Sequence, residues 1–304
     1  MQRNLLTKFF KSMAIIYSNA VGKAKGSMGM ITYTTRGGAT IGKQKVFNPA
    51  NPKTNRQMYR RTCWANLVNI WQTMLGNDKP SFESKAARVS DYNRFIGVNA
   101  DGPRVYLTKS EATQGGSVIA GYIMTEGSLT AIDVLQTAGQ FVTNVNVGET
   151  AVSSSTSVGT LADAIVENNT DWHYGDKISA FVFEQSVDSV TGVPHVVCRS
   201  YNITLISEDE RTLGTVLGGN LEAFTVTGGK LGMQGPINGG VAWIHSRIDG
   251  STGKTLVSSQ SVNVTNNILS SYTSASRREA AIISYGGKPN SAFLTPDVEA
   301  YISA

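Results

Sequence analysis

Apolar and polar positions along the chain follow two different periods, which divide it into a helical part and a strand-rich part. Thr54 follows a turn with two prolines and is a suitable N-cap, so a long amphipathic helix is predicted from there to about residue 75. A second helix is predicted at residues 90–98. In the first helix, four apolar positions fall at i, i+3, i+7 and i+10 on one predicted face: Trp64, Leu67, Trp71 and Met74.

Beyond residue 98 the pattern changes to short apolar runs separated by glycine or polar turns, which is typical of strands. Two further short helices are predicted, at residues 158–168 and 274–285. We therefore predict a mainly β protein with added helices (α+β) and a β-sandwich-like body over residues 99–304. The predicted strands are residues 105–107, 117–124, 128–134, 140–147, 177–185, 195–206, 221–227, 240–248 and 254–264.

The N-terminal residues are rich in glycine and are predicted to form a flexible, basic segment that leads into a β-hairpin. Its strands are expected at residues 30–35 and 40–47, with the turn at Gly37-Gly38. A short hairpin cannot bury a core of its own, so we expect it to lie on another surface. A neighbouring subunit is the leading interpretation, and the chain's own body is the alternative. The predicted units are a basic arm (residues 1–52), a helical segment (53–98) and the body (99–304).

Charge is distributed unevenly along the chain. Residues 1–77 contain twelve Lys or Arg and no Asp or Glu. Since the whole chain has 27 basic and 22 acidic residues, the remaining 227 residues carry 15 basic and all 22 acidic ones, a net charge of −7. A positive segment of this size indicates an anionic partner, such as nucleic acid or the acidic face of another subunit.

Candidate contact residues follow from this charge and from the helix pattern. Three arginines occupy the first two turns of the predicted long helix, where the helix dipole favours negative charge instead. Either an external anion meets them, or they form an ordinary solvated basic face. The two tryptophans of this helix are interpreted as core or interface packing, not as a ligand cage. The candidate residues are Arg36, Lys43, Lys45, Arg56, Arg60, Arg61, Trp64 and Trp71.

The sequence contains no motif that predicts an enzyme, a cofactor or a metal site. Residues 250–255 (GSTGKT) resemble part of a phosphate-binding loop, but Ile248 stands where that pattern requires glycine. The three histidines, His173, His195 and His245, are isolated in sequence, as are Cys63 and Cys198.

An acidic group surrounds Trp172 in the sequence. It is interpreted as a solvated turn or as a surface that binds the basic arm of another subunit. Its members are Asp163, Glu167, Asp171 and Asp176. No apolar run approaches the roughly 20 residues of a membrane span, so no membrane partner is predicted.

Several motifs together resemble a family of phage proteins. The pattern NPxNPKTxxQ at residues 48–57 is followed by Arg60, Arg61 and the tryptophan helix. Further similar segments are YNRF (92–95), VYLTK (105–109), YIMTEGSL (122–129), LADAIVENN (161–169), PHVVCRSYNITL (194–205) and SRREAAIISYG (276–286). In these segments the chain is similar to structural proteins of gut bacteriophages and prophages, especially crAss-like phages of the Bacteroides group.

The resemblance implies a virion component that is assembled in the cytoplasm of the host bacterium. Combined with the charge distribution, it predicts a non-enzymatic structural protein that forms a symmetric oligomer, as a ring, connector or head-associated subunit. Its expected partners are copies of itself and other virion proteins. The alternative is a virion protein that binds packaged DNA non-specifically through its basic arm and helix.

Overall fold

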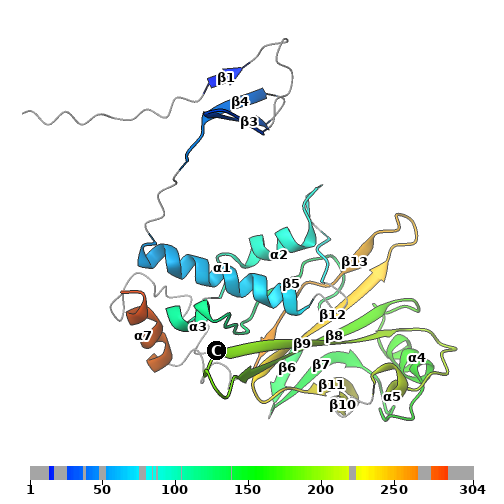
Figure 1. Cartoon of the computed structure of the whole chain (residues 1–304). Coiled ribbons are helices and arrows are strands. Elements are labelled where there is room, and N and C mark those ends of the chain that lie inside the picture. The colour runs from blue at the N-terminus through cyan, green and yellow to red at the C-terminus, as the bar shows by residue number, and fades with distance from the viewer. Residues whose placement is uncertain are drawn as a thin grey trace, which may run out of the picture. The chain divides into compact units, whose positions relative to one another are not determined.

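The chain separates into two units after Lys53 in a computed structural model of all 304 residues (Figure 1). The arm is therefore residues Met1–Lys53, and the body is Thr54–Ala304. The predicted helical segment belongs to the same unit as the strand-rich residues, because its buried face contributes to their core. The structure describes residues 14–16, 26–36, 39–47, 53–74, 80–83, 85, 86, 88–103, 105–137, 139–218, 224–265 and 275–286.

The described part of the arm is a four-stranded antiparallel sheet in the order β1-β4-β3-β2. Two of its strands confirm the predicted hairpin strands, although β4 ends three residues before the predicted strand does; the Gly37-Gly38 turn lies outside the described residues. Within the segment predicted as a flexible entry, β1 and β2 pair with the hairpin, and these two strands were not predicted. The strands are β1 (Ala14–Ile16), β2 (Gly26–Met28), β3 (Ile31–Arg36) and β4 (Ala39–Gln44).

Helices α1 (Asn55–Thr73) and α2 (Asp91–Asn99) confirm the two helices predicted for residues 53–98. Thr54 is the N-cap of α1, and its side chain accepts a hydrogen bond from the backbone N–H of Gln57. Ser90 caps α2 in the same way. These local capping signals fix where both helices begin.

The body is built in three layers (Figure 1). A five-stranded antiparallel sheet lies in the middle, with the order β13-β12-β8-β9 and β15 paired to β12. One of its faces packs against α1 and α2, and the other packs against a four-stranded sheet in the order β10-β11-β7-β6 and against α4. Both faces of the middle sheet are therefore buried, which explains the near-continuous apolar runs of β8 and β12.

Predicted and observed elements of the body agree best for the long, regular ones. The helix α4 has the predicted bounds, and β7, β8, β9, β12 and α7 lie within a few residues of theirs. The observed strands are β5 (Ile123–Thr125), β6 (Val134–Thr137), β7 (Gln140–Asn146), β8 (Lys177–Val187), β9 (Pro194–Thr204), β10 (Phe224–Thr227), β11 (Lys230–Gln234), β12 (Gly239–Ile248), β13 (Thr255–Val257), β14 (Gln260–Ser261) and β15 (Asn263–Val264). The remaining helices are α3 (Lys109–Thr113), α4 (Val158–Asn168), α5 (Leu213–Val216) and α7 (Ala275–Ser284).

Several predicted strands are wrong. Residues 105–107 and most of 117–124 and 128–134 are not strands, although many of them are buried, and residues 254–264 form three short strands instead of one. The short helices α3 and α5 and the strand β11 were not predicted. The apolar runs in these segments reflect burial, which strands and irregular segments share.

The segment at residues 117–123, which is irregular up to the start of β5, obtains many of its backbone hydrogen bonds from side chains. The side chain of Asn66 on α1 accepts from the Val118 N–H (2.8 Å) and donates to the Val118 carbonyl (3.0 Å) and to the Tyr122 hydroxyl (2.6 Å). Asn99 on α2 bonds both backbone groups of Ile123 in the same manner. These amides take the place of a neighbouring strand, because buried backbone groups require partners.

Replacing Asn66 with alanine is expected to lower the free energy of unfolding by about 2–3 kcal/mol, because the buried backbone groups of Val118 lose their partners. Urea denaturation followed by circular dichroism would measure this loss. The control is Gln72→Ala on the exposed side of α1, for which we expect a change below about 0.5 kcal/mol. Equal effects of the two substitutions would contradict the proposed role of the Asn66 amide.

Candidate interaction surface

The basic candidates of the arm lie on and beside its hairpin. Lys43 in β4 and Lys45 just beyond it are exposed, and the Lys45 Nζ lies 5.3 Å from the centroid of the Phe47 ring. Arg36 is the last residue of β3, and its side chain lies outside the described part of the structure. The arm therefore presents at least two ammonium groups to solvent.

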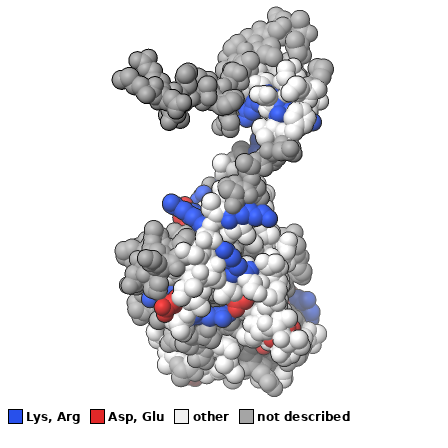
Figure 2. Space-filling view, turned by 60° about the vertical axis from the view of Figure 1, so that its left-hand side comes forward, with Lys and Arg blue, Asp and Glu red and all other residues white. Residues whose placement is uncertain are grey.

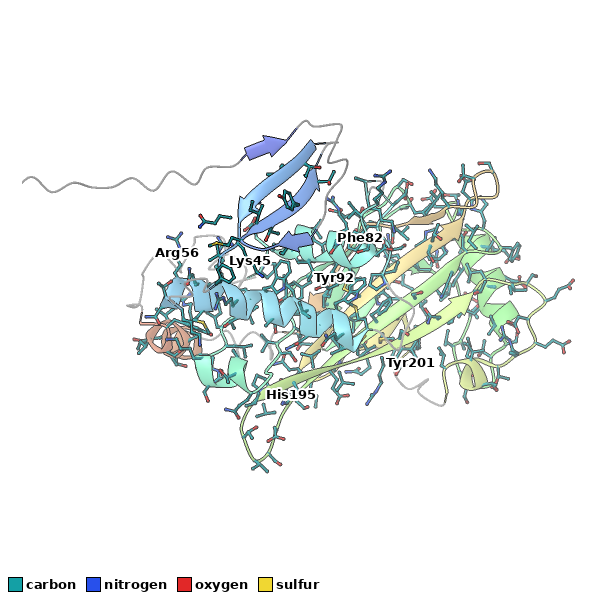
Figure 3. All side chains as sticks on the ribbon, turned by 45° about the horizontal axis from the view of Figure 1, so that its top comes forward. Lys45, Arg56, Phe82, Tyr92, His195 and Tyr201 are labelled. Carbon is teal, nitrogen blue, oxygen red and sulfur yellow. The ribbon has the colours of Figure 1, made fainter. Side chains whose placement is uncertain are left out.

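The arginine candidates lie together on the outward side of α1 and are all exposed, together with Trp64. Figure 3 shows Arg56 at the N-terminal end of this helix. Arg60 and Trp64 follow at intervals of four residues, so the three side chains form one row. We call this surface the Arg–Trp face: Arg56, Arg60, Arg61 and Trp64.

Acidic side chains neutralise the Arg–Trp face only weakly. Arg60 Nη1 lies 3.3 Å from Asp101 Oδ1, but the two side chains are 57% and 86% exposed. Ion pairs with this exposure contribute little, about 0–1 kcal/mol. Figure 2 views the molecule from the side on which α1 begins, and on this side Lys and Arg atoms are more frequent than Asp and Glu atoms. Arg56 and Arg60 therefore keep most of their positive potential.

The two tryptophans of α1 have opposite environments, which corrects the predicted helix face. Trp71 is buried against Phe95 and Tyr92, with ring centroids 5.3 and 5.8 Å away, so it belongs to the chain's own core and is not an interface residue. Trp64 is 53% exposed and was wrongly assigned to the apolar face. Because helical positions are about 100° apart, Trp64 and the buried Asn66 point to nearly opposite sides.

A buried charge cluster lies between the start of β8 and the end of β12. Asp176 is 1% exposed, and its two carboxylate oxygens receive hydrogen bonds from Arg247 Nε at 2.6 Å and Nη2 at 2.7 Å. His245 Nε2 lies 2.9 Å from Asp176 Oδ2, and the His245 ring stacks on Trp172 with a centroid distance of 3.8 Å. His173 Nδ1 lies 2.6 Å from Arg247 Nη2.

The cluster corrects the interpretation of Asp176 and shows contacts of the histidines that the sequence did not indicate. Asp176 was placed in a solvated acidic group, whereas Asp163, Glu167 and Asp171 of that group are at least partly exposed. His173 and His245 are far apart in sequence but share the contacts of Arg247 and Asp176. His245 and Arg247 are two positions apart in β12 and therefore lie on the same face of the strand. This spacing indicates that a carboxylate lies beside that face, but it does not identify Asp176 as its source.

The hydrogen bonds around Asp176 keep it ionised. Burial alone would raise the pKa of this carboxyl, but the hydrogen bonds with Arg247, with His245 and from the His173 backbone outweigh burial and hold the pKa well below its ordinary value. The hydroxyl of Ser258 accepts a hydrogen bond from the backbone N–H of His245, so it holds the strand and does not orient the imidazole ring. The contacts of the cluster therefore tie the turn at residues 171–176 to β12.

The remaining candidate chemistry is limited in the part of the chain that the structure describes. Burial raises the pKa of Cys198 to about 12, so its thiol is protonated at neutral pH. Within the described ranges, no group of three or more His, Cys, Asp or Glu side chains is arranged to hold a metal ion. No described helix has the length and apolar character needed to cross a membrane.

No protein-family model, curated protein or solved structure gives a significant match to the chain.

Replacing Asp176 with asparagine is expected to lower the free energy of unfolding at pH 7 by about 3 kcal/mol, because Arg247 then loses its buried carboxylate partner. The folded-state pKa of Asp176 is depressed, so its contribution is complete above the ordinary Asp pKa of about 3.9 and is lost as the pH falls below it. Urea unfolding should therefore show a smaller difference between the two proteins at pH 3 than at pH 7.

The exposed residue Asp133 provides the matched control, since Asp133→Asn removes the same charge outside the cluster. We expect this variant to differ from the wild type by less than about 0.5 kcal/mol at either pH. A difference for Asp176→Asn that does not shrink on acidification would refute the stabilising role of its ionised form.

Proposed function

We propose that the chain is a structural subunit of a bacteriophage virion that assembles with copies of itself into a symmetric, non-enzymatic oligomer. The similarity of its NPxNPKTxxQ segment and tryptophan helix to phage structural proteins supports this role. The observation that carries the proposal is the composition of the arm. Among the arm residues whose side chains the structure describes, no large apolar side chain is buried, although the arm forms a four-stranded sheet.

A sheet of short strands is stable only when one of its faces is covered. The arm instead exposes four large apolar side chains by 43–65%: Met30, Ile31, Val46 and Phe47. Lys43 and Lys45 add positive charge beside them. Exposed apolar groups mixed with one sign of charge are typical of a surface that binds another protein. In the proposed oligomer, the arm covers these groups by binding a neighbouring subunit.

We also infer that the body is a β-sandwich with an added helical layer that serves as a rigid frame for these contacts. Its two larger sheets share one core that includes Phe141, Leu231 and Trp243. A frame buried on both faces of its middle sheet leaves the arm, the loops and the outward side of α1 to bind other subunits.

The assembly is expected to depend on salt, since contacts between the basic arm and an acidic surface are screened within about 10 Å at 0.1 M ionic strength. Size-exclusion chromatography with light scattering should show an oligomer at 50 mM NaCl and smaller species at 1 M NaCl. A monomer at every salt concentration would contradict the proposal.

The contribution of the arm can be separated from that of total charge. Lys43→Glu/Lys45→Glu is expected to shift the oligomer toward monomer at 50 mM NaCl, because it reverses the charge of the exposed hairpin. Lys230→Glu/Lys254→Glu changes the net charge equally at exposed positions of the body and should leave the oligomer intact. Identical behaviour of the two double variants would argue against binding through the arm.

A further inference from the structure

We propose that subunits also join head to tail through their bodies: the Arg–Trp face of one copy binds an acidic face beside α4 of the next copy. This inference rests on the proposed oligomer and names a pair of surfaces that form it. The Arg–Trp face is the set of exposed residues defined above on α1. The acidic face is formed by α4 and two adjoining loops and consists of Asp163, Glu167, Tyr174, Ile206, Glu208 and Glu210.

Backbone contacts build the acidic face by holding the loop at residues 206–210 against α4. The N–H of Gly159 donates to the Asp209 carbonyl at 2.9 Å, and a Cβ at Gly159 would lie 2.2 Å from the Ser207 carbonyl oxygen. Only glycine therefore allows the loop to approach so closely. The N–H of Gly175 donates to the Leu205 carbonyl at 2.8 Å, which joins the turn that carries Tyr174 to the residue before Ile206.

Apolar groups and negative charge are combined on this face. Tyr174 is 51% exposed and Ile206 is 45% exposed, and the Tyr174 hydroxyl donates to Asp163 Oδ1 at 2.9 Å. The nearby Arg211 is bound to Asp209 at 2.6 Å, which neutralises both. Among the described residues, Glu167, Glu208 and Glu210 form no ion pair. The face thus keeps a negative potential around an exposed aromatic ring.

The two faces are chemically complementary. Each has a half-exposed aromatic side chain, Trp64 or Tyr174, bordered by charges of one sign. Tryptophan, tyrosine and arginine are the residues most enriched at the energetic centres of protein interfaces. Guanidinium groups also bind carboxylates with two parallel hydrogen bonds, which gives both strength and a defined orientation. Contact between copies would pair these groups and cover both rings.

The positions of the two faces determine the symmetry of the assembly. Figure 1 places the N-terminal half of α1 and the helix α4 at opposite ends of the body. A contact between different surfaces at opposite ends is heterologous, so each subunit can bind one neighbour at each end. Such contacts produce a ring when the rotation closes and a filament when it does not. A two-fold dimer would require a self-complementary surface instead.

Nucleic acid is the other anionic partner that the Arg–Trp face could bind, through phosphate contacts and stacking on Trp64. It would leave the acidic face, with its exposed Tyr174 and Ile206, without an occupant. A second copy satisfies both faces at once, and the same chain supplies both. The observations therefore favour contact between copies.

Reciprocal charge reversal tests the contact. One variant is Arg56→Glu/Arg60→Glu, and the other is Glu167→Lys/Glu208→Lys; all four positions are exposed, so both variants should keep the wild-type thermal unfolding midpoint. Alone, each variant should self-associate about 100-fold more weakly than the wild type, because like charges then face each other. An equimolar mixture should recover an oligomer in which the two variants alternate, as native mass spectrometry of differently labelled chains would show.

The outcomes separate this inference from the proposed function. Recovery in the mixture, with Lys230→Glu/Lys254→Glu behaving as the wild type, supports the head-to-tail contact. A wild-type oligomer that both reversed variants reproduce, or a mixture that stays dissociated, overturns the contact while leaving the oligomer standing. A wild-type monomer overturns both. Unchanged assembly of Arg56→Glu/Arg60→Glu with a loss of duplex DNA retention would assign the Arg–Trp face to nucleic acid and also overturn the contact.

Discussion

The need to hydrogen-bond a buried, irregular backbone is the constraint on which the arrangement of the body depends. Residues 117–122, which lead into β5, pass through the core without a continuous neighbouring strand, and a buried peptide group without a partner is costly. Side-chain amides of Asn66, Asn99 and Gln185 supply the missing partners from α1, α2 and β8. Since each amide must meet a specific peptide group, these elements have little freedom to slide. The direction in which α1 presents its outer side follows from this restriction.

This constraint also explains why two polar residues lie among the apolar ones on the inward side of α1. Thr62 and Asn66 are buried and bond to Tyr285, Val118 and Tyr122, while Trp64 lies outside. A periodicity argument treats every tryptophan as a core residue and every asparagine as a surface residue. It therefore predicted the existence and the N-cap of α1 correctly but assigned Trp64 to the wrong side. The caps are local signals within three residues, whereas the partners of Asn66 are more than 50 residues away.

The same distinction between local and distant partners applies to the strands and to the charge cluster. Regular segments such as β8, β12 and α4 were predictable because their own composition and spacing specify them. Residues 117–124 have the composition of a strand, but side chains from distant elements satisfy much of their backbone. Asp176 and Arg247 are 71 positions apart, so only the folded sheet brings them together. Charge density along the chain was visible in the sequence, whereas the surface on which each charge lies was not.

Two contacts per subunit would act together in the proposed assembly. A head-to-tail contact between bodies leaves exposed ion pairs that are individually weak, and the arm alone carries few apolar groups. If an arm binds a body that is already held head to tail, the second association becomes intramolecular and benefits from a high effective concentration. Weak contacts of this kind dissociate singly but hold a closed ring jointly. The first 77 residues contain twelve basic and no acidic residues, whereas all 22 acidic residues follow them. This separation of charge along the chain favours contacts between oppositely charged surfaces of neighbouring subunits and disfavours like-charged pairings.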